Sequence, residues 1–157
     1  MVRLADLTPA EREHLNAKTR EFEGYTGRPW VRGPALAKRR VAIITTSGIH
    51  RIGDRPFADG AAAADYRVIP GSVKAGDLVM SHLSTNFDRT GFQQDVNVVF
   101  PIDRLHEVAA DGLIGAVADF HYSFMGAAPV RTLEPKAREL AGLLKEDCVD
   151  AVLLTPV

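Results

Sequence analysis

The sequence predicts an α/β fold in which flanking helices cover a mostly parallel sheet, as in a Rossmann-like three-layer sandwich. One observation is the β-branched, apolar run at 41–46, which is typical of a strand buried on both faces of a parallel sheet. Another is the alternation of strand-like and helix-like segments, which implies right-handed crossovers. The length of 157 residues also suits one ordinary domain with a substantial core.

Residues 1–40 are predicted to form a helix and an irregular lead-in to the α/β domain, which occupies residues 41–157. The helix starts at Thr8, Pro9 and Glu11, because threonine caps, proline suits the first helical position and glutamate completes a capping box. It is expected to end near Phe22. Glycines and prolines favour loop over the rest of the lead-in.

The predicted domain continues with short strands and two clear helices. A long polar loop is expected over 47–64. The later elements are expected to be short strands at 66–69 and 77–82, a strand or loop at 95–100, a helix at 101–109, a strand at 114–120, a helix at 134–146 and a strand at 150–154. Both helices are amphipathic, and the first opens on Pro101 and ends before Gly112.

Charge and cysteine content exclude several classes of protein. The 19 basic and 20 acidic residues nearly cancel, so neither nucleic acid nor an anionic membrane is indicated as a partner. No apolar run approaches the ~20 residues that a membrane span needs. The amino terminus lacks the features of a secretory signal, and Cys148 is the only cysteine, so a cytoplasmic location is expected.

Three histidines are predicted to lie at strand ends. His50 follows the first strand, His82 ends the third, and His121 closes the fifth. Ligands bind beyond the carboxyl ends of strands in open parallel sheets, so these side chains are expected to share one crevice. Loop histidines bonded to the backbone, or a three-histidine metal site, are the alternatives, although the spacings match no compact ligand motif.

The densest polar stretch, 81–97, follows a predicted strand and embeds two phenylalanines among charges. A site for a small zwitterion would use such groups. Arginine can donate two parallel hydrogen bonds to a carboxylate, and aspartate or histidine can bind an amine. The alternative is an internal ion-pair network that joins two loops, for example Asp88 or Asp95 with Arg55 or Arg89.

Six motifs stand out along the predicted domain: SGIHR at 47–51, GDRPF at 53–57, YRVIP at 66–70, NFDR at 86–89, DVNVVFPIDRL at 95–105 and HYSFMG at 121–126. Together they resemble the selenoprotein B family of glycine, sarcosine, betaine and D-proline reductases. The resemblance implies component B, the substrate-specific subunit of a complex that cleaves C–N bonds reductively. It also implies a partner subunit whose pyruvoyl group holds the substrate amine, and no cofactor in this chain.

The resemblance implies a substrate site without a nucleophile among the residues present. Its orienting and charge-pairing residues are expected to be His50, Asp54, Arg55, His82, Asn86, Asp88, Arg89, Asp95, Asn97, His121 and Ser123. The expected ligand is a small amino acid or a betaine-like compound. The expected protein partners are other reductase subunits and a second copy of the chain.

The family places a selenocysteine or cysteine in a U/C-x-x-C motif directly after a strand that resembles 150–157, and the sequence ends at Val157. Because UGA encodes selenocysteine and is also a stop codon, we expect a truncated reading of a longer gene. The alternative is a non-catalytic binding module. Cys148 precedes the last strand among acidic neighbours and is expected to be structural. Ending at a strand predicts exposed apolar sheet surface and self-association.

Overall fold

The computed structural model describes residues 3–20, 24, 27, 30–57, 62–83 and 89–157, in two compact units, 1–32 and 33–157. The first unit contains helix α1 (Pro9–Arg20). The Thr8 amide donates to the Glu11 carboxylate at 3.0 Å, and the Glu11 amide donates to the Thr8 hydroxyl at 3.3 Å, so the predicted capping box is confirmed. Phe22, the predicted helix end, lies outside the described residues.

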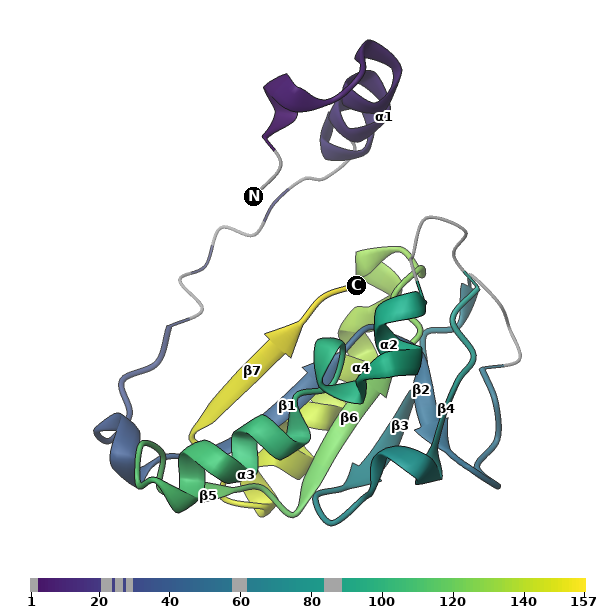
Figure 1. The fold of residues 1–157 in the computed structure, drawn as a ribbon. Helices are drawn as coiled ribbons and strands as arrows, with labels where there is room; N and C mark the ends of the chain where they lie inside the picture. Colours follow the sequence, from purple (N-terminus) through teal and green to yellow (C-terminus); the bar gives the residue numbers. More distant parts are fainter. Residues whose placement is uncertain (1–2, 21–23, 25–26, 28–29, 58–61, 84–88) are drawn as a thin grey trace. The chain divides into compact units, whose positions relative to one another are not determined.

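The second unit is built on a mostly parallel sheet with β1 (Arg40–Thr45) in the middle, as predicted (Figure 1). On one side β1 pairs in parallel with β7 (Ala151–Thr155). On the other side it pairs in parallel with β5 (Ala116–Val117) and then with β6 (Phe120–Phe124). The antiparallel strand β3 (Tyr66–Pro70) pairs with β6 and completes the sheet.

A helix covers each face of this sheet, which gives the predicted three layers. On one face Val41 and Ile43 of β1 belong to the same core cluster as Leu105 of helix α3 (Ile102–Ala110). On the other face Tyr122 and Phe124 of β6 pack with Leu140 of helix α4 (Val130–Glu146). Because successive side chains of a strand point to opposite faces, the apolar run of β1 supplies both cores.

The predicted polar loop over 47–64 was wrong in part, because it contains strand β2 (Ile49–Arg51). This strand pairs antiparallel with β4 (Leu78–Met80) in a separate two-stranded sheet. The strand expected over 77–82 is therefore present but lies outside the parallel sheet. The buried Ile49 side chain anchors β2 in the main core, which explains how a three-residue strand persists within a polar segment.

Two further elements differ from the predictions. Residues 95–100 contain a 3-10 turn, Val96–Val98, after a short helix, α2 (Thr90–Gln94). The strand predicted over 114–120 is two strands, β5 and β6, and β6 continues to Phe124. Residues 121–123 are polar, so nothing in the sequence indicated that the strand continues through them. The side chains of all three are buried.

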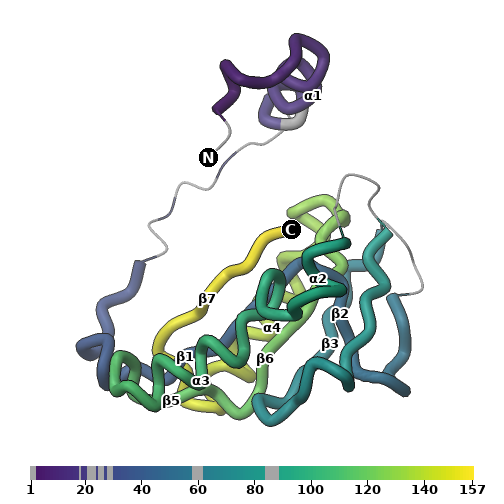
Figure 2. The backbone as a smooth tube through the Cα atoms, in the orientation of Figure 1, coloured from purple at the N-terminus to yellow at the C-terminus, as the bar shows by residue number. Residues whose placement is uncertain are grey.

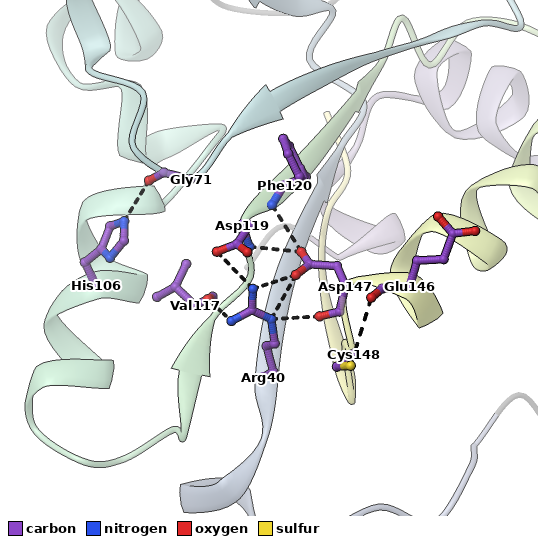
Figure 3. A network of polar contacts seen from close by, with 9 residues as sticks. All are labelled: Arg40, Gly71, His106, Val117, Asp119, Phe120, Glu146, Asp147 and Cys148. Atoms are coloured by element: carbon purple, nitrogen blue, oxygen red, sulfur yellow. Dashed lines mark hydrogen bonds and ion pairs between the residues drawn. The ribbon is translucent and has the colours of Figure 1, made fainter.

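A polar network ties the amino ends of the strands to the end of α4 (Figure 3). The Arg40 guanidinium donates to the Asp147 carboxylate at 3.0 Å, to the Val117 carbonyl at 3.0 Å, and to the Asp119 carboxylate at 3.0 Å. The other oxygen of Asp147 accepts the backbone N–H groups of Asp119 and Phe120 at 2.9 and 3.2 Å. One carboxylate thus joins β1, the β5–β6 connection and α4.

Asp147→Ala is expected to lower the free energy of unfolding by about 3 kcal/mol, because the change removes one of the two carboxylates that pair with the half-buried Arg40 and leaves two backbone N–H groups without their acceptor. Urea denaturation measures this difference. The matched control is Glu134→Ala, which removes an exposed ion pair with Arg138 on α4 and is expected to change stability by less than about 0.5 kcal/mol. Equal effects of the two substitutions would contradict the role of the network.

Candidate functional site

Hydroxyl side chains gather at the carboxyl ends of the parallel strands. Thr45 ends β1 and Thr155 ends β7, and both hydroxyls donate to the Val99 carbonyl, at 2.9 and 3.0 Å. Ser123 lies opposite Thr45 in the register of β1 and β6 and is fully buried. Because parallel strands end at the same edge, this carboxyl edge collects polar groups from three strands.

Two glycines let the chain pass tightly across the carboxyl edge. Gly48 has φ +66°, and a Cβ added there would lie 3.1 Å from the His82 amide nitrogen. Gly126 has φ +82°, and a Cβ there would lie 2.6 Å from Cβ of Thr46. The Gly48 amide donates to the Phe124 carbonyl at 2.9 Å, and the Gly48 carbonyl accepts from the Ser81 amide at 2.9 Å. These contacts place the β2–β4 sheet beside the carboxyl edge.

His50, on β2, and Ser81, directly after β4, form a hydrogen-bonded pair. Nδ1 of His50 lies 3.0 Å from the Arg51 carbonyl, which can only accept, so Nδ1 carries the proton of the neutral ring. Nε2 is then the acceptor, and it lies 2.7 Å from the Ser81 hydroxyl. An imidazole oriented in this way can take a proton from the hydroxyl, which is the arrangement used for general-base catalysis.

His82 follows Ser81 and is also buried. Burial lowers the pKa of His82 from its ordinary value, and the nearby positive charge of Arg89 lowers it further. The Arg89 guanidinium also donates to the His82 carbonyl. His82 is therefore a neutral imidazole at pH 7 in the same strand-end segment as Ser81, where it can donate one hydrogen bond and accept another.

Four of the predicted site residues organise loops. Asp54 accepts from the Arg51 guanidinium at 3.2 Å, and this bond lowers the pKa of the Asp54 carboxyl. Arg55 is exposed, and its carbonyl accepts from Arg67 at 2.6 Å.

Asp95 accepts from the Asn97 amide at 2.9 Å. The Asn97 side chain reaches Asp103, also at 2.9 Å, in the first turn of α3. Asp95 and Asn97 therefore fix the start of α3. Asn86 and Asp88 lie outside the described residues.

The predicted position of His121 was wrong. It is the second residue of β6, towards the amino end, and its Nδ1 accepts from the Ile43 backbone N–H at 2.9 Å. The strand pairing of β1 is broken between β5 and β6, and the imidazole supplies the acceptor that is missing there. Burial lowers the pKa of His121 to about 4, so the ring is neutral.

The position of His121 also removes the three-histidine metal site. Within the described ranges, no group of three or more His, Cys, Asp or Glu side chains could hold a metal ion. Ser123 lies at the carboxyl edge, and its hydroxyl is a buried group without a hydrogen-bond partner in the described part of the chain. In that same part, no helix is both long enough and apolar enough to cross a membrane.

The expected site residues did not include Ser81, Thr45 or Thr155, although Ser81 begins the polar stretch 81–97. The threonines have the β-branched side chains that are common in strands, so the sequence does not distinguish them. Only the strand register shows that both hydroxyls reach the Val99 carbonyl. Ser81 gave a signal of its own, since it stands next to His82 after an apolar strand. Its pairing with His50, which lies 31 positions away, required the fold.

Comparisons with known proteins assign this chain a family. Residues 23–157 match the family model described as glycine/sarcosine/betaine reductase selenoprotein B. The D-proline reductase subunit gamma of Acetoanaerobium sticklandii is 38% identical over 122 residues, or 76% of this chain. The glycine reductase complex component B subunit gamma of Symbiobacterium thermophilum is 32% identical over 127 residues. The betaine reductase complex component B subunit beta of Peptoclostridium acidaminophilum is 28% identical over 123 residues.

The chain spans about half the length, or less, of the curated relatives it matches. The matched segment covers 49% of the D-proline reductase subunit, 29% of the glycine reductase subunit and 28% of the betaine reductase subunit. No solved structure matches the chain.

The buried His121 predicts acid sensitivity. Its pKa is about 4 in the folded state against 6.5 ordinarily, so the native state binds fewer protons than the unfolded state between these values. This contribution to the free energy of unfolding is fully present above pH 6.5. It decreases by on the order of 3 kcal/mol as the pH falls towards 4.

Denaturant titrations across this pH range measure the slope of stability against pH. In His121→Asn, which cannot ionise, most of the slope is expected to disappear. The control His14→Asn changes an exposed residue of α1 and is expected to keep the slope. An unchanged slope in His121→Asn would refute this assignment.

Proposed function

Since the chain belongs to the glycine/sarcosine/betaine reductase selenoprotein B family, we propose that it forms the substrate-side α/β scaffold of a component B subunit. The observation that carries this proposal is the family match over residues 23–157, which includes every element from β1 to β7. The proposed reaction is the reductive cleavage of a C–N bond. Other subunits of such a complex are the proposed partners.

The proposed ligand is a small molecule that carries both an amine or ammonium group and a carboxylate. D-proline, glycine and betaine, for which the relatives are named, share this chemistry. Arg89, whose guanidinium is anchored to the His82 carbonyl, is proposed to bind the carboxylate, because a guanidinium has five donors. The neutral His82 ring, His50 and Ser81 are proposed to face the nitrogen end of the ligand.

The His50–Ser81 pair is proposed to move a proton from the substrate. This step applies to ligands with an N–H group, such as glycine and D-proline, and not to betaine, whose nitrogen carries no proton. The ligand ammonium gives a proton to the Ser81 oxygen while the Ser81 proton passes to Nε2 of His50, which leaves a neutral amine and an imidazolium. The short separation of 2.7 Å and the fixed tautomer support this role. A neutral amine is the form that adds to a carbonyl, the group that a pyruvoyl-carrying partner subunit would supply.

The reactive selenocysteine or cysteine of the family is proposed to lie directly after Val157. The Val157 amide donates to the Thr46 hydroxyl at 2.9 Å, so this end of the described chain is held at the carboxyl edge. Cys148 is unsuited to the role, since it precedes β7 at the opposite end of that strand (Figure 3). The second candidate function is a module that binds a small amino acid or a betaine-like compound without redox chemistry.

Ligand binding tests the proposed site. Calorimetry with glycine, sarcosine, betaine and D-proline is expected to show binding of at least one compound to the 157-residue chain. Ser81→Ala is expected to weaken binding of a ligand with N–H groups about tenfold, the effect of losing one hydrogen bond of about 1.4 kcal/mol. The control Thr19→Ala removes an exposed hydroxyl from α1 and is expected to leave affinity unchanged. If none of the four compounds binds, the proposed ligand site is contradicted.

The nucleotide sequence after the codon for Val157 tests the proposed redox residue. An in-frame UGA followed by two further codons and a cysteine codon is expected, because the family motif is U/C-x-x-C. A UAA or UAG codon at that point would overturn the proposal, and the binding module would become the preferred function. Peptide mass spectrometry of the native product provides an independent reading of the same segment.

A further inference from the structure

Arg67 is a nearly buried cation beside the carboxyl edge. It is the second residue of β3, and because β3 runs antiparallel to β6, the start of β3 lies at that edge. The register places Arg67 opposite Ser123, so the two side chains lie on the same face of the sheet. The Arg67 side chain is 11% exposed. A charge that is so deeply buried must be paired and hydrogen-bonded, so its partners identify its role.

Four acceptors hold the Arg67 guanidinium. It donates to the Arg55 and Pro56 carbonyls at 2.6 and 2.9 Å. It also donates to the Tyr66 carbonyl at 2.9 Å and to the Asp65 carboxylate at 2.7 Å. A guanidinium has five N–H groups, so these bonds use most of its donors. Arg67 is therefore suited to holding the backbone at Arg55 and Pro56 and not to binding a ligand.

The same guanidinium fixes the side chain of Phe57. Its central carbon lies 4.3 Å from the centre of the Phe57 ring, which is a cation–π contact. Phe57 is buried and packs with Ala63 and Met125. The two carbonyls that accept from Arg67 directly precede Phe57 in the chain. One arginine thus holds both the ring of Phe57 and the backbone that leads to it.

The Phe57 ring in turn contacts the His50 imidazole. Strand β2, which carries His50, lies beside β3 (Figure 2). The centroids of the two rings are 6.4 Å apart and their planes make an angle of 68°, which is an edge-to-face arrangement. Rotation of a histidine ring about its Cβ–Cγ bond has broad energy minima, so packing against a fixed neighbour narrows its orientation. Phe57 is such a neighbour for His50.

We propose that Arg67 is a positioning residue for the His50–Ser81 pair and acts through Phe57. The two backbone bonds and the cation–π contact fix Phe57, and its ring holds the imidazole with Nε2 directed at the Ser81 hydroxyl. This role rests on the proposed function, because the orientation matters for the proton transfer proposed for that pair. A misplacement of about 1 Å at a reacting group lowers a rate by on the order of 100-fold.

The ring nitrogens of His50 test the proposal without any ligand. Long-range proton–nitrogen NMR spectra of the isotope-labelled chain are expected to show His50 in one tautomer, with the proton on Nδ1. Arg67→Met keeps an unbranched side chain but removes the charge and all donors. It is expected to release Phe57, so that His50 populates both tautomers. A His50 spectrum in Arg67→Met that equals the wild-type spectrum would overturn the proposal.

A second variant keeps the test decisive if Arg67→Met does not fold. Phe57→Leu leaves Arg67 in place and is expected to give the same mixture of tautomers, because the contact with His50 is lost. A wild-type His50 spectrum in Phe57→Leu would also overturn the proposal.

The matched control is Tyr66→Phe. It removes a hydrogen bond of 2.8 Å to Glu139 on the other face of β3 and is expected to leave His50 in one tautomer. An equal change of the His50 spectrum in this control would show that any disturbance of β3 has the effect, and the specific role of Arg67 would be refuted.

Ligand affinity separates the positioning role from the proposed function. Arg67→Met is expected to weaken the binding of glycine or D-proline about tenfold, as Ser81→Ala does, because both changes remove the same hydrogen bond to the ligand. The double variant is expected to bind no more weakly than Ser81→Ala alone, since effects that pass through one pair of residues are not additive. Additive losses would overturn the proposal. If the tautomer changes as expected and no compound binds the wild type, the positioning role stands and the proposed function fails.

Discussion

The contacts of the Asp147 carboxylate fix the geometry on which the rest of the α/β unit depends. They hold the Arg40 guanidinium at the start of β1 and the two N–H groups at the start of β6. These bonds lie at the amino ends of the strands, and the strand pairing carries the alignment to the opposite edge. Thr45, Ser123 and Thr155 reach the same level there because their strands are held in register at the other end.

The chemically useful groups at the carboxyl edge come from outside the parallel sheet. His50 and Ser81 belong to the two-stranded sheet or directly follow it, and the Gly48 amide joins that sheet to β6 by donating to the Phe124 carbonyl. The parallel sheet supplies a rigid platform of hydroxyls, and the small sheet supplies imidazoles. In many folds a rigid scaffold positions loops or added segments that carry the functional residues, and changes in those segments allow one fold to bind different substrates.

Features encoded by neighbouring residues were predictable from the sequence. The buried run of β1, the capping box of Thr8 and Glu11, and the amphipathic faces of α3 and α4 all show local periodicity or spacing. The short strand β2 and the break between β5 and β6 have no such signal, because both depend on partners far along the chain. His121 was misplaced for this reason: its role is set by Ile43, 78 positions away.

The hydrogen bond between His121 and Ile43 has a consequence for the dynamics of the sheet. The Ile43 amide belongs to the middle of the central strand, where exchange of backbone hydrogen with solvent is slowest in most folds. Its acceptor is an ionisable ring instead of a carbonyl. Protonation of that ring removes the acceptor, so one deeply buried amide reports the charge of a side chain through its exchange rate. The exchange rate of the Ile43 amide therefore reports acid-induced opening of the central strand.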